Sequence, residues 1–288
     1  MKKKINLFDS VVWLVLVVWG LAIFYPIYNS ILVSFMKEGE YVNSMFSLWV
    51  KEPTLNAYKE VFAGGRVAKG YMNTLIILLL YMPLSLFMVT ATAYALSRKK
   101  YFMSSFINNA MVFTMYFGGG LIPLYLLVKN LNLLDSLASL VFVGAMSTYN
   151  MIVCKSFFYT LPDSLEESAK LDGANDILIY WRIYLPLAKP VLATIFLFTL
   201  TSKWNEWYNP MLFLTDSDKW PLQLMLREVI GSNTAADKGA IDAAVEQKSY
   251  TMGVKMATVV VTMLPVMCIY PFLQKYFMSG MTLGAIKE

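Results

Sequence analysis

The chain has 288 residues, is 58% hydrophobic and 15% charged, and has a mean hydropathy of +0.54 and a formal net charge of +5. Soluble chains are about half apolar and about a quarter charged, so this composition indicates a membrane protein. The chain has no histidine, and its two cysteines, Cys154 and Cys268, lie in apolar runs. We therefore expect no metal site, no histidine-based catalytic group and no disulfide framework. A G-x-x-x-x-G-K-[ST] motif for ATP phosphates is also absent.

Polar residues divide the chain into six apolar runs. Each is long enough to cross a hydrocarbon core of about 30 Å at about 1.5 Å per residue. The first run follows three lysines and lacks a small-residue cleavage site, so it predicts a retained span and not a signal peptide. We expect an all-α polytopic protein with six transmembrane helices in a single domain, residues 1–288. The predicted spans are 11–36, 71–96, 105–128, 137–158, 190–214 and 254–278.

Cations beside the span ends predict the orientation. The lysines at positions 2–4 and the cations at positions 98–100 form tight clusters, and such clusters stay on the cytoplasmic side. Long outer loops count for little under the same rule. Both termini and the polar loop 159–189 are therefore predicted to be cytoplasmic, and the loops 37–70 and 215–253 lie outside.

The loop from Leu161 to Pro190 reads LPDSLEESAKLDGANDILIYWRIYLPLAKP and begins as a short helix. Ser164 precedes Glu167 by three residues, which is the spacing of a capping box. Glu166 and Lys170 have the spacing of a helical ion pair with the acid first. Gly173 then allows the chain to leave the helix. A second amphipathic piece, 177–184, leads to two prolines that interrupt regular hydrogen bonding.

This loop resembles the EAA loop of ABC-importer permeases, in which E-A-A is followed by a glycine and then by I-x-L-P. Here the pattern reads Glu167-Ser168-Ala169, then Gly173, then I-Y-L-P over 183–186, with Ser168 where alanine is commoner. The resemblance implies a coupling helix that docks in a cleft of a separate ATPase subunit. The implied coupling residues are Ser164, Leu165, Glu167, Ser168, Ala169, Asp172 and Gly173. The alternatives are a surface helix that packs on its own chain, and a Glu167 that only caps it.

Further motifs are similar to maltose-type carbohydrate permeases of ABC importers and extend the resemblance over nearly the whole chain. They include Asn73-Thr74, AYALSR at 93–98, the run 119–136, Trp204-Asn205 and the tail 273–288. GGLIP and LQKYF point to the subgroup that imports oligosaccharides or polysaccharide fragments.

That resemblance implies the type I ABC importer fold in a bacterial cell membrane, as a multi-pass protein that performs no chemistry. The implied partners are a second homologous permease, two ATPase subunits, an extracellular sugar-binding protein, membrane lipid and the carbohydrate, with no nucleic acid. ATP and Mg²⁺ belong to the ATPase subunits, so this chain is expected to bind no cofactor. The cytoplasmic tail carries Gly280, Met281, Leu283 and Ile286, and the resemblance implies that these residues enter the interface between the ATPase subunits. The alternative is a frayed chain end.

The third predicted span contains three consecutive glycines, of which Gly118 and Gly119 are candidates for a cavity wall. Irregular backbone at membrane depth is tolerated where protein or a water-filled cavity covers it. The alternative is that the small residues let helices pack closely.

The fifth predicted span supplies the second pathway candidate, Trp204, Asn205 and Glu206. Lys203 and Glu206 are ionisable residues that lipid penalises, so we expect them to face the interior and to pair. Aromatic faces with amide and carboxylate groups suit a sugar, which has C–H faces and hydroxyls. The alternative is an aromatic belt at the outer interface, to which Tyr208 and Trp220 are assigned.

Three classes of function remain open from the sequence. The first is the ABC-importer permease, in which an amino-acid or anion importer would share the same coupling loop. The second is a secondary transporter driven by an ion gradient, for which Glu206 is the candidate intramembrane carboxylate. The third is a membrane receptor or assembly factor without transport. Dependence of transport on a partner ATPase separates the first class from the other two.

Overall fold

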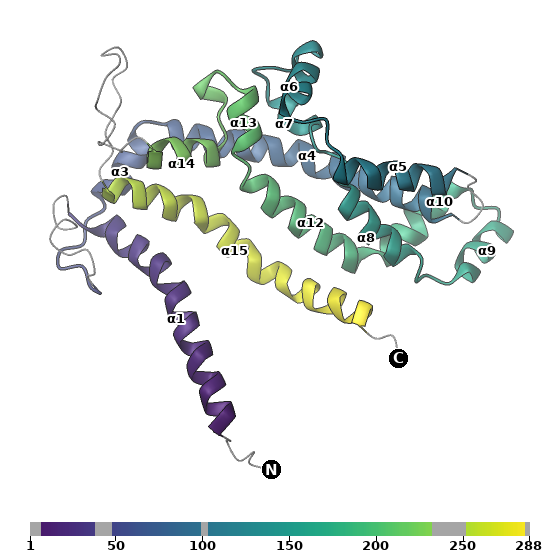
Figure 1. Ribbon diagram of the computed structural model, residues 1–288, viewed down its shortest axis with the longest axis horizontal. Coiled ribbons are helices and arrows are strands. Elements are labelled where there is room, and N and C mark those ends of the chain that lie inside the picture. The colour runs from purple at the N-terminus through teal and green to yellow at the C-terminus, as the bar shows by residue number, and fades with distance from the viewer. Residues whose placement is uncertain (1–6, 38–47, 99–102, 232–251, 286–288) are drawn as a thin grey trace. The chain divides into compact units, whose positions relative to one another are not determined.

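The computed structural model describes residues 7–37, 48–98, 103–231 and 252–285, with side chains as far as 271. Every regular element in these ranges is a helix (Figure 1). The chain divides into two compact units, which are described separately. The first contains residues up to 68 together with 225–265, and the second contains 69–224 and the chain from 266 onward. The single domain predicted from the sequence stays a prediction.

The first unit contains α1 (Leu7–Phe35), α3 (Asn56–Ala63), most of α14 (Leu222–Gly231) and the first part of α15 (Met252–Ala285). Apolar side chains on α1 are exposed from Phe8 to Phe24, as expected of a helix that faces lipid. Only its last turn is buried, where Val33 and Met36 pack with Val50. Gly253 of α15 lies beside this turn, and a Cβ there would lie 3.7 Å from the carbonyl oxygen of Val33, an ordinary van der Waals distance.

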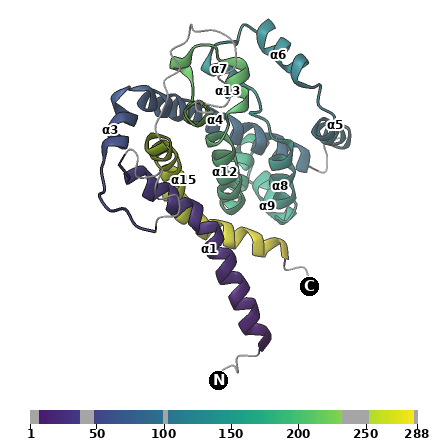
Figure 2. The same ribbon diagram turned by 60° about the vertical axis from the view of Figure 1, so that its left-hand side comes forward.

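The second unit is a bundle around α4 (Arg66–Ser97). Its further helices are α5 (Ser104–Tyr116), α6 (Leu121–Asn130), α7 (Leu137–Phe142), α8 (Thr148–Phe158), α9 (Asp163–Leu171), α10 (Asp176–Ile179), the π-helix η1 (Tyr180–Tyr184), α11 (Leu185–Leu187), α12 (Lys189–Trp204), α13 (Tyr208–Phe213) and the short 3₁₀ helix η2 (Ser217–Lys219). α8 and α12 lie beside α4 in both views (Figures 1 and 2).

Two apolar cores hold this unit together. The larger joins α4, α8, η1 and α12 through fully buried side chains such as Val89, Met151 and Ile195. The smaller joins α6, α7 and α13 through Val128, Leu140 and Phe213. The larger core continues to Tyr94, Tyr180 and Tyr184, which lie at the end of the bundle next to α9. The packing therefore connects the loop after α8 directly to the membrane helices.

Three of the predicted spans are broken where the sequence predicted continuous helices. The third is bent by 113° between α5 and α6, where Gly120 has a φ of 88°. The fourth is divided into α7 and α8 by a segment in which Gly144 has a φ of 76°. The fifth stops at Trp204 and restarts as α13 at Tyr208. Both positive φ values are conformations that glycine adopts without the cost that a Cβ imposes.

Judged by length and composition, fewer of the described helices can cross a membrane than the six spans that were predicted. Three are long and apolar enough to cross a membrane, α1, α4 and α15, or up to five if each bent pair is one span. The second bent pair is Asp176–Leu187 with Lys189–Trp204, which meet at 79°. Six spans and the cytoplasmic position of both termini stay predictions.

Candidate coupling site and substrate pathway

Helix α9 starts two residues earlier than the predicted capping box requires. Pro162 is its N-cap, with a φ of −62° and a ψ of 134°, and it provides no side-chain cap. The predicted capping box is therefore wrong: Ser164 lies inside the first turn instead of ahead of it. The cause is that Pro162 already turns the chain, so that Asp163 becomes the first helical residue. Glu167 is consequently free of the capping role.

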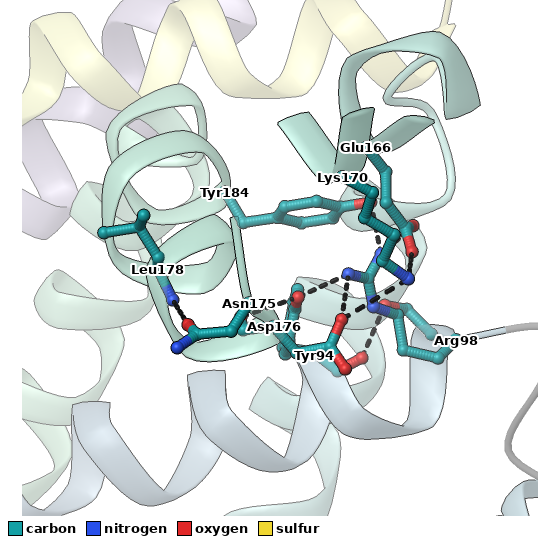
Figure 3. Close-up of polar contacts among 9 residues, drawn as sticks. Tyr94, Arg98, Glu166, Lys170, Asn175, Asp176, Leu178 and Tyr184 are labelled. Atoms are coloured by element: carbon teal, nitrogen blue, oxygen red, sulfur yellow. Dashed lines mark hydrogen bonds and ion pairs between the residues drawn. The ribbon is translucent and has the colours of Figure 1, made fainter. Parts of the chain in front are cut away.

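The end of α9 is as predicted. Gly173 has a φ of 83°, and its N–H donates to the carbonyl of Lys170 at 3.1 Å. The N–H of Ala174 donates to the carbonyl of Ala169 at 2.9 Å. These two bonds form a Schellman motif, which satisfies the last carbonyls of the helix. The next helix is capped by Asn175, whose Oδ1 accepts from the N–H of Leu178 at 2.8 Å (Figure 3).

Four charged side chains connect α9 and α10 to the end of α4 (Figure 3). Arg98 pairs with Glu166, and Glu166 accepts from Lys170 at 2.7 Å, as the predicted i,i+4 pair requires. Lys170 lies 3.5 Å from Asp176, and Asp176 lies 3.5 Å from Arg98. The four side chains thus form a closed ring in which cations and anions alternate. We call Arg98, Glu166, Lys170 and Asp176 the Arg98 ion ring. The Glu166 carboxylate also raises the pKa of Lys170.

Tyrosines surround the Arg98 side chain on its inner side. Its guanidinium carbon lies 4.3 Å from the ring centroid of Tyr94 and 5.0 Å from that of Tyr184, within the range of cation–π attraction. It also donates to the Tyr184 hydroxyl at 3.1 Å and to the Tyr94 hydroxyl. Tyr184 belongs to η1, and Tyr180 of the same π-helix shares a 2.7 Å hydrogen bond with Thr90 of α4. The π-helix thus presents two tyrosines to α4, and such helices are often found at functional sites.

The predicted coupling residues divide between the outer and inner sides of α9. Ser164, Leu165, Glu167, Ser168, Asp172 and Gly173 are exposed, whereas Ala169 packs against the larger core. Leu171, which the sequence prediction omitted, is 89% exposed. An exposed leucine next to small and acidic residues suits a surface that a partner covers.

A groove of about 780 Å³ lies beside α9, lined by the ends of α4 and α8. Arg98, Tyr184 and Phe158 form its inner wall, and Glu166 and Glu167 line its α9 side. Sequence reasoning used Arg98 as part of the cationic cluster at 98–100 and of a family motif, but it assigned the residue no contact. The available signal was a cation at the end of an apolar run in a chain with an acidic loop that is predicted to be cytoplasmic.

The two candidate pathway glycines lie in the non-helical segment between α5 and α6. Both Gly118 and Gly119 are exposed, and a Cβ at Gly118 would meet nothing within 4 Å. Close helix packing at Gly118 is therefore absent among the described residues. Neither glycine lines the cavities described below.

The three pathway candidates of the fifth span face two different cavities. Trp204 and Asn205 line an apolar cavity of about 600 Å³ between α12 and α15. Trp204 is 4% exposed, and its indole N–H has no hydrogen-bond partner within the described chain. Glu206 turns to a second cavity, and its predicted pair with Lys203 is present at 2.6 Å. Asn209 donates to the same carboxylate at 2.6 Å.

The second cavity has a volume of about 450 Å³ and a mostly polar lining. The Lys203 ammonium lies 4.2 Å from the ring centroid of Tyr81, and Asn150 donates to Thr199 at 3.2 Å. Polar side chains inside a membrane bundle are costly and mark pathways for polar solutes. The sequence prediction missed Tyr81, Asn150 and Thr199. The signal for the last two was a polar residue in an otherwise apolar run.

The predicted tail contact lies at the edge of the described chain. The helix α15 continues to Ala285, past the predicted end of the last span at 278, so the backbone of Gly280, Met281 and Leu283 is helical. Their side chains, and Ile286 altogether, are outside the described residues. A contact of this tail with a partner stays a prediction.

All-helical structure with several helices that are long and apolar enough to cross a membrane defines a polytopic membrane protein. Residues 58–283 match the family described as "Binding-protein-dependent transport system inner membrane component". The chain belongs to this family. The expected all-α fold, the multi-pass membrane location and the resemblance to ABC-importer permeases are thereby confirmed.

Two relatives come from Bacillus subtilis (strain 168). Protein LplC is 39% identical over 88% of this chain and 86% of its own length. The polygalacturonan/rhamnogalacturonan transport system permease protein YtcP is 37% identical over 99% of each chain. Among solved structures, a bacterial ABC transporter involved in the import of the acidic polysaccharide alginate contains a similar chain. Its TM-score is 0.84 at 32% identity, with 96% of this chain and 99% of that chain covered.

Proposed function

We propose that the chain is the permease subunit of an ATP-binding-cassette importer for oligosaccharides or polysaccharide fragments. The observation that carries the proposal is the exposed face of α9, which the Arg98 ion ring joins to a membrane helix in a chain of this family. The relatives named for polygalacturonan, rhamnogalacturonan and alginate transport support a polysaccharide-derived substrate.

In this proposal the chain itself performs no chemistry. Two ATPase subunits hold ATP and Mg²⁺ and hydrolyse the nucleotide, a second permease completes the membrane part, and an extracellular binding protein delivers the sugar. Ser164, Leu165, Glu167, Ser168 and the end of α9 contact an ATPase subunit, and the tail from Gly280 contacts the same pair. Closure of the ATPases moves α9, and the bundle changes between its inward-facing and outward-facing states.

The proposed pathway uses both cavities of the second unit. The polar cavity offers amides, hydroxyls and the Lys203–Glu206 pair to sugar hydroxyls. The apolar cavity is lined by Trp204, whose aromatic ring suits the C–H face of a sugar. Gly118 and Gly119 form an exposed, irregular segment that is proposed to border the pathway when partners are present.

The test is reconstitution of the purified complex in proteoliposomes. The tagged chain is isolated with its co-purifying subunits and binding protein, and uptake is measured for oligogalacturonides, alginate oligosaccharides, galacto-oligosaccharides and maltodextrins. Uptake that requires ATP is expected for at least one of these sugars. Uptake driven by an ion gradient without ATP would support the secondary transporter instead, and ATP-driven uptake of amino acids alone would contradict the carbohydrate assignment.

A further inference from the structure

The Arg98 ion ring joins three separate segments of the chain, and Arg98 directly follows the last residue of the membrane helix α4. Glu166 and Lys170 come from α9, and Asp176 comes from the start of α10. The side chain of Arg98 is only 15% exposed and that of Glu166 is 23% exposed. Water is largely excluded from this pair, so its attraction is stronger than that of a surface pair.

The guanidinium is suited to this position by its shape. One terminal nitrogen, Nη1, meets Glu166 and the Tyr184 hydroxyl, and the other, Nη2, meets Asp176 and the Tyr94 hydroxyl. A planar, rigid fork can hold α9, α10 and η1 at fixed angles to each other. A lysine ammonium is a single point charge on a flexible stem and cannot reproduce these directions.

α9 also contacts the bundle through apolar groups, but these contacts do not fix its orientation. Ala169 packs on the edge of the larger core, while Leu165 and Leu171 point outward. A small side chain on an apolar surface permits sliding, because apolar attraction is not directional. Charge-assisted hydrogen bonds are directional and strong, so they resist such sliding.

From this geometry we infer that Arg98 is a positioning residue for coupling: it transmits the displacement of α9 to α4, so that ATP-driven movement reaches the membrane bundle. The inference deepens the proposed function and depends on it. Without the Arg98 link, α9 moves with the ATPase while α4 stays behind, and hydrolysis continues without transport.

The experiment compares variants in the reconstituted complex, with the panel sugar that the wild type takes up fastest. Arg98→Gln removes the charge and the fork, and Arg98→Lys keeps the charge alone. Both should retain assembly and ATP hydrolysis but reduce the sugar imported per ATP hydrolysed by about tenfold or more. Arg182→Gln removes an exposed arginine from the same loop and should leave this ratio unchanged, which controls for net charge.

A double-mutant cycle tests whether Arg98 acts through α9. Glu166→Gln alone should lower the ratio, and the double variant Arg98→Gln/Glu166→Gln should lower it no further than Arg98→Gln does. A merely structural role would instead lower assembly or thermal stability and leave the ratio of the assembled complex intact.

Each other outcome has a defined meaning. Three results would overturn the inference and leave the proposed function standing. They are a wild-type ratio of sugar imported to ATP hydrolysed in the assembled Arg98→Lys complex, additive losses of this ratio in the double-mutant cycle, and failure of both Arg98 variants to assemble. Absence of ATP-driven uptake by the wild-type complex would contradict the proposed function, and this inference with it.

Discussion

At the scale of single residues, two adjacent glutamates on α9 have opposite environments. Glu166 is half-buried and bound by Arg98 and Lys170, whereas Glu167 is exposed and has no hydrogen-bond or ion-pair partner among the described residues. The sequence suggested that Glu167 caps the helix, and the structure removes that role. A carboxylate that its own chain leaves unpaired is available to a cation on a partner.

The first prediction concerns the charge of this residue. Glu167→Gln should leave the thermal stability of the purified chain unchanged, since the side chain has no polar partner among the described residues, and it should lower ATP-driven uptake in the reconstituted complex. Glu60→Gln, an exposed substitution on α3, is the matched control and should change neither property. Equal uptake by Glu167→Gln and wild type would remove Glu167 from the proposed ATPase contact.

A second residue-scale prediction concerns Gly120, which has a φ of 88° at the bend between α5 and α6. Gly120→Ala places a Cβ in a conformation that costs an L-residue about 1–2 kcal/mol. Its melting temperature in detergent should therefore fall. Gly118→Ala is the control, because Gly118 has an ordinary φ and open space around it, and it should be close to neutral. Equal melting temperatures for the two variants would show that the bend relaxes without strain.

At the scale of elements, Asp135 connects the turn after α6 to the segment between α13 and α14. Its Oδ1 accepts from the backbone N–H groups of Thr215 and Asp216 at 3.1 and 3.0 Å. Its Oδ2 accepts from Lys219 at 2.5 Å. The bond from Lys219 lowers the pKa of Asp135, and Asp135 in turn raises the pKa of Lys219.

This arrangement predicts a pH dependence at the acid side. Because the folded pKa of Asp135 lies below its unfolded value, its contribution is present above the unfolded pKa and is lost as the pH falls through the folded one. The raised pKa of Lys219 makes its contribution complete below its unfolded pKa, so the lysine adds no acid-side loss. Asp135→Asn should flatten the fall in melting temperature on acidification. An identical acid profile in both proteins would contradict a linkage through Asp135.

Much of the element order follows from the sequence, but the breaks within spans do not. Charged residues mark the approximate limits of the apolar runs, and the Gly173 terminus of α9 was predicted, whereas α4 starts before its predicted span and α15 continues beyond its own. The bends at Gly120 and Gly144 depend on a positive φ, and glycine permits that conformation without requiring it. The start of α9 was mispredicted because both Pro162 and Ser164 can precede the first turn of a helix. The sequence favoured Ser164 as the N-cap, and in the structure Pro162 is the N-cap.

In the candidate site, too, local motifs were predictable from the sequence and contacts between distant residues were not. Glu167, Ser168 and Ala169 lie together on α9, as a local motif must, and the I-Y-L-P part of the EAA pattern lies in η1 and α11. Arg98 and Asp176 are 78 positions apart in the sequence (176 − 98) and meet only through tertiary packing. Sequence periodicity carries no information on such pairs. Trp204 and Glu206 were predicted to face one pathway and instead line different cavities, because α12 ends at Trp204 and the helical register is lost after it.

At the scale of the whole molecule, the predicted orientation can be tested by thiol labelling. In a Cys268→Ser background, which leaves only the buried Cys154, a cysteine at Asn175 should react only with membrane-permeant reagents in intact cells. A cysteine at Lys129, an exposed position at the end of α6, should react with impermeant reagents. Labelling of the Asn175 position from outside would reverse the predicted topology.

The ion pairs of the Arg98 ion ring also differ in how strongly dissolved salt weakens them. The side chains of Lys170 and Asp176 are 44% and 67% exposed, so mobile ions screen that half of the ring, with a Debye length of about 8 Å at physiological salt and about 3 Å at 1 M. The Arg98–Glu166 half is covered by tyrosines and is screened much less. Concentrated salt therefore weakens the contacts of Asp176 with Lys170 and Arg98 before it weakens the Arg98–Glu166 pair. A bacterium that accumulates cytoplasmic ions would retain the connection of α9 to the end of α4 while losing the contacts of Asp176.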